Sequence, residues 1–170
     1  MPQFYLLHES PELTIAHDKR NCWLYVQWLG DHNAESIRGG CLLLLHHLRE
    51  TKCVKLLTDD THVTTTAQPS SADLAWQTVV VPYEGSAAWV GSTFYTMLAE
   101  AGLQYIAWVN APSMLNRRTA DLALAISETV QLSENRPLVA TFDDLASAYE
   151  WLQKRESRRQ YAGEMPSFIH

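Results

Sequence analysis

Apolar residues recur along the chain at two spacings, one typical of β-strands and one typical of α-helices. Two short runs rich in β-branched and aromatic residues, 13–16 and 23–28, flank the polar turn HDKRN and predict a β-hairpin. Three later runs, 53–57, 103–109 and 137–142, are short, apolar and bounded by polar residues, which predicts three further strands.

Between these strands, apolar residues three and four positions apart predict helices. The first helix has Asp31 or Asn33 available as N-cap, and its apolar stripe consists of Ala34, Ile37, Cys41, Leu44, Leu45 and Leu48. The second ends at Gly102, because glycine readily terminates helices, and its apolar face consists of Ala87, Val90, Phe94, Leu98 and Ala101. A third helix is predicted after Pro112. A fourth covers 145–152, with Thr141 and Asp144 at the spacing of a capping box.

The resulting order, ββαβαβαβα, predicts a single α/β domain with a mostly parallel mixed sheet and helices packed on it. The 170 residues are the size of one domain. We expect an N-terminal extension at residues 1–11, the domain at 12–156 and a flexible C-terminal tail at 157–170. Residues 58–83 break the pattern, and connections of that length in compact domains tend to be functional or to contain extra elements.

Composition and motifs exclude several classes of protein. A net charge of -6 with only 13 Lys and Arg argues against nucleic-acid binding, which needs clustered basic residues. No apolar run is long enough for a membrane span, and no secretory signal pattern is evident, so we expect a cytoplasmic protein. The three cysteines form no paired motif, and we expect them to be reduced. No nucleotide-binding glycine motif or nucleophile elbow is present, so we expect no cofactor and no enzymatic activity.

The clearest candidate for a functional segment is LTDDTHVTTT, which directly follows the strand predicted at 53–57. Asp59, Asp60, Thr61 and His62 would form a polar loop at the end of the sheet. Two or three donors within four residues rarely complete a metal site, so we predict no metal. Asp and Thr favour turns, and a purely structural connection is the alternative to a switch or partner-binding loop.

Four segments carry a resemblance to a known fold family: WLYVQWLG, LLTDDTHV, AAWVGSTFYTMLAEAGLQYIAWVNAPSM and ATFDDLASAYEWL. Over about residues 12–153 the chain resembles small bacterial proteins with the STAS-like (SpoIIAA-like) fold. Anti-sigma factor antagonists have this fold, and CRAL-TRIO-type domains share it loosely. In the antagonists an Asp precedes a phosphorylated Ser or Thr just after the corresponding strand. The resemblance implies that Asp60 and Thr61 are that pair, although His62, Val63 and a threonine run stand where the family has small residues and glycine. A phosphate there would repel a partner or order the loop.

Aromatic residues are concentrated in one third of the chain, at Trp76, Tyr83, Trp89, Phe94, Tyr95, Tyr105 and Trp108. They suit either a small apolar ligand pocket or an ordinary core or dimer contact. Asn110, Ser113 and Arg117 follow the strand at 103–109. They suit either contacts to a polar or anionic ligand or partner, or a helix N-cap with a surface arginine.

We therefore expect a non-enzymatic regulatory or protein-interaction module that binds a partner or itself, for example as a homodimer, through residues 58–66 and 110–117. The alternative is a carrier or sensor for a small-molecule or lipid-like ligand. An interaction module predicts no enclosed cavity, whereas a carrier predicts an apolar cavity of several hundred Å³ bounded by Trp89, Tyr105 or Trp108. An enzyme would need Asp59, Asp60 or His62 to converge with Asn110 and Arg117.

Overall fold

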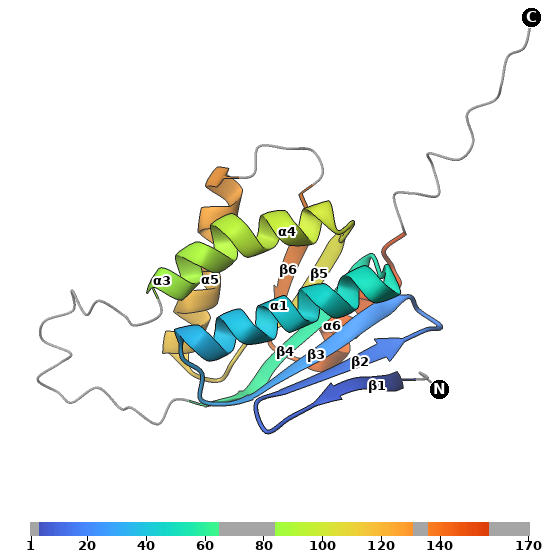
Figure 1. The fold of residues 1–170 in the computed structure, drawn as a ribbon, viewed down its shortest axis with the longest axis horizontal. Helices are drawn as coiled ribbons and strands as arrows, with labels where there is room; N and C mark the ends of the chain where they lie inside the picture. The colour runs from blue at the N-terminus through green and yellow to red at the C-terminus, as the bar shows by residue number, and fades with distance from the viewer. Residues whose placement is uncertain (1–3, 65–83, 131–135, 157–170) are drawn as a thin grey trace, which may run out of the picture.

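A computed structural model of the protein describes residues 4–64, 84–130 and 136–156 (Figure 1). Its elements, in chain order, are β1 (Phe4–Glu9), β2 (Leu13–Asp18), β3 (Trp23–Gly30), α1 (Ala34–Thr51), β4 (Lys55–Val63), α3 (Glu84–Trp89), η1 (Val90–Phe94), α4 (Tyr95–Glu100), β5 (Tyr105–Val109), α5 (Met114–Val130), β6 (Leu138–Phe142) and α6 (Leu145–Gln153). The predicted tail, and Trp76 and Tyr83, lie outside the described residues.

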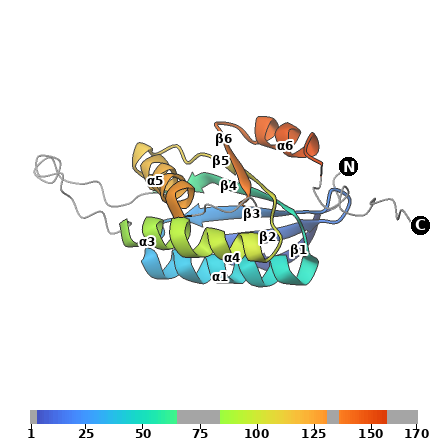
Figure 2. The same ribbon diagram turned by 90° about the horizontal axis from the view of Figure 1, so that it is seen from above.

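The strands form one six-stranded mixed sheet in the order β1-β2-β3-β4-β5-β6. Strands β1 to β3 pair antiparallel and β3 to β6 pair parallel, which confirms the predicted α/β class and mostly parallel sheet. Right-handed crossovers that advance in one direction put their helices on one face of the sheet. Figure 2 shows α1 and α4 on one side of the sheet and α6 on the opposite side. The sheet is therefore covered by helices on both faces.

The predicted N-terminal extension is corrected by strand β1, which pairs with β2 and so belongs to the sheet. The register shifts between Leu6 and His8, so the regular alternation that identifies a strand in a sequence is broken there. Phe4 and Leu6 are also exposed, as residues of an edge strand often are. The sheet accordingly contains one strand more than predicted.

The predicted polar loop after residue 57 is also corrected, because β4 continues to Val63 and contains Asp59, Asp60, Thr61 and His62. Strand β4 lies between β3 and β5 and pairs with both. Pairing with β5 ends at Asp59, and pairing with β3 continues to Val63, which outweighs the turn preference of Asp and Thr. The other strands and helices predicted above are present.

Helix α1 follows its sequence signals closely. The Asn33 side chain caps the helix by accepting a hydrogen bond of 2.8 Å from the Ser36 N–H, and the Ser36 hydroxyl completes the capping box. Four of the predicted stripe residues are buried against the sheet: Cys41, Leu44, Leu45 and Leu48. This packing forms the larger hydrophobic core, which includes Leu24, Val26, Leu56 and Ile106 from the strands.

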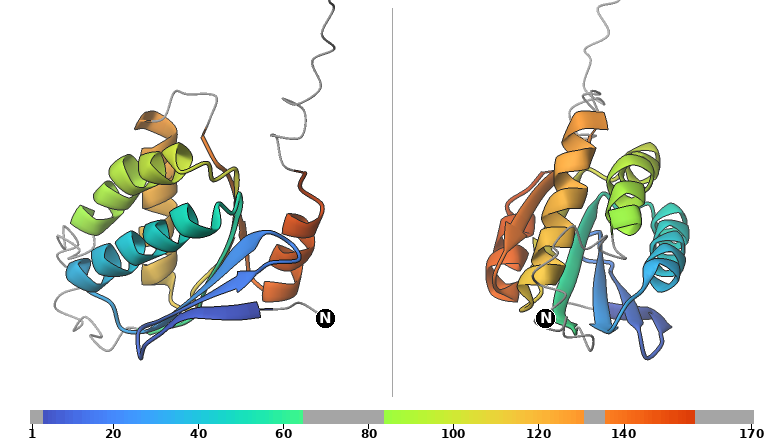
Figure 3. Two further views of the ribbon diagram at one scale, coloured as in Figure 1. Left: turned by 45° about the vertical axis from the view of Figure 1, so that its right-hand side comes forward. Right: turned by 90° about the vertical axis from the view of Figure 1, so that its left-hand side faces the viewer.

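The second predicted helix contains a π-helical segment, Val90–Phe94, between α3 and α4. The extra residue in this turn lets the adjacent Phe94 and Tyr95 both be buried. Gly102 has a φ of 94°, in agreement with its predicted role at the helix end. Figure 3 shows α5 running steeply across this helical segment, with which it is in contact.

Helix α6 packs on the other face of the sheet through Ala148 and Leu152, against Trp23, Leu57 and Tyr105. The capping box predicted from Thr141 is wrong, since Thr141 belongs to β6. Asp144 is the N-cap, and its carboxylate accepts hydrogen bonds of 2.8 Å from the N–H and the hydroxyl of Ser147. Strand β6 thus ends two residues before the cap.

Two glycines in helices allow a direct test of this packing. A Cβ at Gly91 would meet the Ala123 carbonyl oxygen and Ile126 of α5, whereas a Cβ at Gly39 would meet nothing within 4 Å. We expect Gly91→Ala to lower the free energy of unfolding by about 1–3 kcal/mol through overpacking. Gly39→Ala is the matched control and should raise it by about 0.5–1 kcal/mol. Urea denaturation measures both, and equal effects would contradict the close approach of η1 to α5.

Candidate functional site

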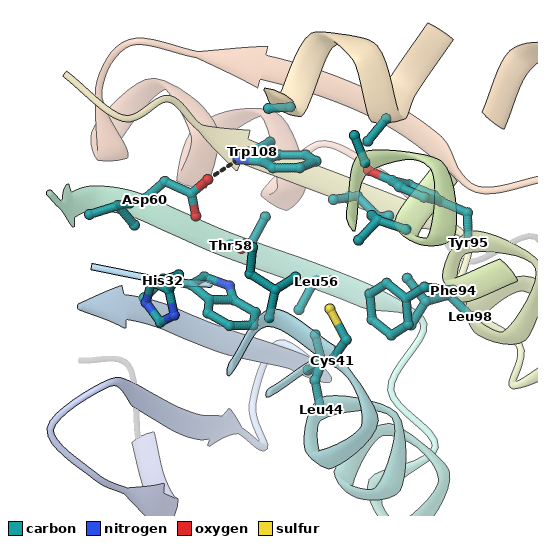
Figure 4. A pocket seen from close by; sticks show the side chains of 18 residues that line it. His32, Cys41, Leu44, Leu56, Thr58, Asp60, Phe94, Tyr95, Leu98 and Trp108 are labelled. Carbon is teal, nitrogen blue, oxygen red and sulfur yellow. Dashed lines mark hydrogen bonds between the residues drawn. The ribbon is translucent and has the colours of Figure 1, made fainter. Parts of the chain in front are cut away.

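A partly open cavity of about 140 Å³ lies between the sheet and the helices on the α1 side (Figure 4). It is lined by strand residues Trp28, Leu56, Thr58, Asp60, Val63, Ile106 and Trp108, by His32, and by helix residues Ile37, Cys41, Leu44, Ala87, Val90, Phe94, Tyr95, Leu98, Ala120 and Ala123. Most of these side chains are apolar.

The cavity exists because small side chains face the sheet where larger ones would fill the space. Cys41, Ala87, Ala120 and Ala123 project from three helices toward it, and each is buried. Thr58 is the corresponding small residue of β4. Protein interiors are otherwise close-packed, so this group of small residues leaves room for another molecule.

Alternation along β4 brings Leu56, Thr58 and Asp60 to the cavity face. The indole Nε1–H of Trp108 donates a hydrogen bond of 2.6 Å to Asp60 Oδ2 (Figure 4). For Oδ1 of the same carboxyl, the described residues supply no hydrogen-bond donor, and Asp60 itself lines the cavity. One carboxyl oxygen is therefore available to a bound molecule.

Burial raises the pKa of Asp60 to about 7, and the charge of Asp59 contributes to the rise. The hydrogen bond from Trp108 acts in the opposite direction, because it favours the carboxylate. Asp60 is thus about half ionised near neutral pH. A carboxyl that titrates there responds to small changes in its surroundings.

The other titratable groups of the cavity are neutral. Burial raises the pKa of the Cys41 thiol and of the Tyr95 phenol, so both stay protonated. Burial lowers the pKa of His32, whose Nδ1 lies 3.1 Å from the Ser36 hydroxyl. Neither Lys nor Arg is among the described residues that line the cavity. Asp60 is therefore the charged group of the cavity.

The neighbours of Asp60 in the predicted loop lie on the opposite face of the sheet. Asp59 is buried and accepts hydrogen bonds from the Tyr25 hydroxyl, at 2.8 Å, and from the Thr61 hydroxyl, at 2.7 Å. The His62 Nδ1 lies 3.0 Å from the Thr61 hydroxyl. A register shift between Gln27 and Leu29 gives β4 one residue more than β3, so Asp59 and His62 both fall on this face. The structure thus separates Asp60 from Asp59, Thr61 and His62.

The predicted polar residues after β5 form a separate group. Arg117 lies 3.2 Å from the Asp143 carboxylate and donates a hydrogen bond of 2.8 Å to the Ala111 carbonyl. The Asn110 amide donates to the same carboxylate at 3.4 Å, and the Ser113 carbonyl accepts from the Arg117 N–H at the start of α5. Among the described residues, no hydrogen bond or ion pair joins this group to Asp59, Asp60 or His62.

Of the three aromatic residues expected around a cavity, Trp108 alone lines the 140 Å³ cavity. Tyr105 lies on the opposite face, and its hydroxyl donates to the Glu156 carbonyl at 2.9 Å. Trp89 stacks on Phe94 and lies under the Arg38 guanidinium, beside a wide hollow of about 610 Å³ along the outer side of α1.

The 140 Å³ cavity is also smaller than the several hundred Å³ expected. Trp28 and His32 also line the cavity and were missed, because no local pattern around them indicates which helices they face.

Two other features of the described residues bear on the class of protein. The described residues contain no group of three or more His, Cys, Asp or Glu side chains arranged to hold a metal ion. No described helix is both long and apolar enough to cross a membrane.

The raised pKa of Asp60 predicts a pH-dependent cost to stability. Its pKa rises from an ordinary 3.8 to about 7 on folding. The free energy of unfolding is therefore highest below pH 4, where the carboxyl is protonated in both states, and it decreases as pH rises through 7 because the unfolded state ionises more readily. Asp60→Asn removes this loss. We expect the free energy of unfolding of the variant, relative to the original protein, to increase by about 4 kcal/mol between about pH 4 and about pH 8. Urea denaturation across this range measures it, and a difference independent of pH would contradict the raised pKa.

Comparisons with known proteins find no matching family model and no curated protein that matches the sequence. Among solved structures, the chain is similar to an uncharacterized protein from the DUF3478 family with a SpoIIAA-like fold, from Shewanella loihica PV-4. The identity is 13% and the TM-score 0.39, over 88% of this chain and 92% of that chain. The fold named for that protein is the one that the sequence segments above resemble.

Proposed function

We propose that this protein is a carrier or sensor that binds a small, largely apolar molecule in the cavity between the sheet and α1, η1, α4 and α5. The observation that carries the proposal is an apolar cavity into which one carboxyl oxygen of Asp60 opens without a protein donor among the described residues. Apolar walls with a few placed polar groups are typical of small-molecule sites.

The size of the cavity limits the ligand. An engineered protein cavity of about 150 Å³ lined by Leu, Ile and Phe holds one benzene molecule. At about 140 Å³ this cavity suits a molecule with one ring or a short branched chain. A long-chain lipid does not fit within it.

The same groups support binding over catalysis. The Cys41 thiol stays protonated because burial raises its pKa, and the thiolate is the reactive form. The described residues place no base against the hydroxyl of Thr58 or Tyr95 that would activate it. The proposed role is therefore non-enzymatic.

A protein-interaction role through residues 58–66 and 110–117, and self-association, stay predictions. Residues 58–63 belong to a central strand, and Asn110 and Arg117 are engaged with Asp143. We prefer the carrier or sensor because the described residues form an apolar cavity, although it is partly open and smaller than the several hundred Å³ expected.

Binding of a one-ring probe tests the proposal. We expect benzyl alcohol to bind and to shift the amide resonances of residues around the cavity in two-dimensional NMR spectra. Cys41→Met should weaken this binding at least tenfold, because the flexible Met side chain fills the cavity. The matched control is Leu42→Ala, on the exposed outer side of the same helix and beside the hollow near Trp89.

The two variants distinguish the possible outcomes. If Leu42→Ala weakens binding and Cys41→Met does not, the ligand occupies the outer hollow and the proposal is wrong. If the original protein binds neither benzyl alcohol nor toluene, the cavity is not a ligand site.

A further inference from the structure

The cavity combines a carboxyl group with an absence of positive charge in its lining. Among the described residues that line it, Asp60 is the acidic one and none is Lys or Arg. Asp60 is half-buried, and a carboxylate withdrawn from water without a cation beside it is costly. An anionic ligand would add a second negative charge and would find no basic side chain among the described lining residues. The lining thus disfavours carboxylates and phosphates and favours a cation.

The hydrogen bonding of Asp60 leaves room for one such partner. Trp108 occupies Oδ2, and it does so as a donor, which favours the ionised carboxylate. Oδ1 has no donor among the described residues and remains for a ligand donor. An ammonium group would form a charge-assisted hydrogen bond there, stronger than the bond from a neutral hydroxyl.

Aromatic side chains surround the same space. Trp28, Phe94, Tyr95 and Trp108 all line the cavity. The faces of aromatic rings attract cations, most strongly those of Trp, and the attraction grows when water is excluded. These rings also accept an apolar ring or chain. One lining therefore suits both parts of an apolar amine.

We propose that the ligand is a small organic amine, bound as its ammonium ion to Asp60 Oδ1 with its apolar part among these aromatic rings. This inference rests on the proposed function and specifies its ligand class. Neither the charge of the ligand nor the role of Asp60 in recognising it follows from the fold.

Binding of an ammonium ion requires ionised Asp60, so affinity depends on pH. The titratable groups around Asp60 are Asp59 on its own strand, His32 after β3, Cys41 on α1 and Tyr95 on α4. His32, Cys41 and Tyr95 stay neutral near pH 7 because of burial, and they supply no competing charge. With a pKa of about 7, Asp60 is about one-tenth ionised at pH 6 and nine-tenths at pH 8. Affinity for an amine should therefore rise about tenfold over this range.

Calorimetric titration of the full chain with three probes of one shape tests the inference: benzylamine, benzyl alcohol and benzoate. At pH 8 we expect benzylamine, which stays protonated, to bind at least tenfold more tightly than benzyl alcohol, and benzoate not to bind. Asp60→Asn should abolish the advantage of benzylamine and retain the binding of benzyl alcohol. Asp121→Asn is the matched control, since it removes an exposed carboxylate from α5 and should leave the advantage intact.

The outcomes separate this inference from the proposed function. Equal binding of benzylamine and benzyl alcohol would leave the cavity a ligand site and overturn the amine. An advantage of benzylamine that persists in Asp60→Asn would also overturn it, because the cation would then be recognised elsewhere. If no probe binds, both proposals fall.

Discussion

The position of β4 between β3 and β5, with a hydrophobic core on each face, is the constraint on which the rest of the structure depends. Its side chains alternate between two covered faces, so each polar residue must find a partner on the face to which it is assigned. Asp59 finds Tyr25 and Thr61 on the α6 side. Asp60 finds Trp108 and the cavity on the other side. Two adjacent carboxyl groups thereby acquire different environments and different roles.

The environment of Asp60 is expensive for the folded protein. Burial shifts its pKa toward neutrality, and the small residues around it leave space that larger side chains would fill with a gain in packing. Proteins often give up stability of this kind at sites that bind ligands. The π-helical turn at Val90–Phe94 contributes to the same site, because it directs both Phe94 and Tyr95 inward. Irregular helix geometry of this type is frequent at functional sites.

The resemblance to the anti-sigma factor antagonists and the cavity suggest different uses of the same region. The antagonist pattern concerns Thr61, whose hydroxyl lies on the α6 side within a strand. The cavity concerns Asp60, one residue earlier and on the opposite face. Phosphorylation of Thr61 stays a prediction, and the ligand proposal does not depend on it.

The sequence by itself determined the α/β class, the alternation of helices and strands after residue 13, the Asn33 cap and the glycine at the end of α4, because these depend on local spacing and local backbone geometry. It did not determine that Phe4–Glu9 joins the sheet or that β4 runs on to Val63, since pairing with neighbouring strands outweighs local preference at both places. Only the tertiary structure decided the site. It placed Trp108 against Asp60, sent Tyr105 and Asp59 to the other face, and left a cavity where small residues from separate helices meet. Such a space depends on how distant segments pack, which no local pattern of residues encodes.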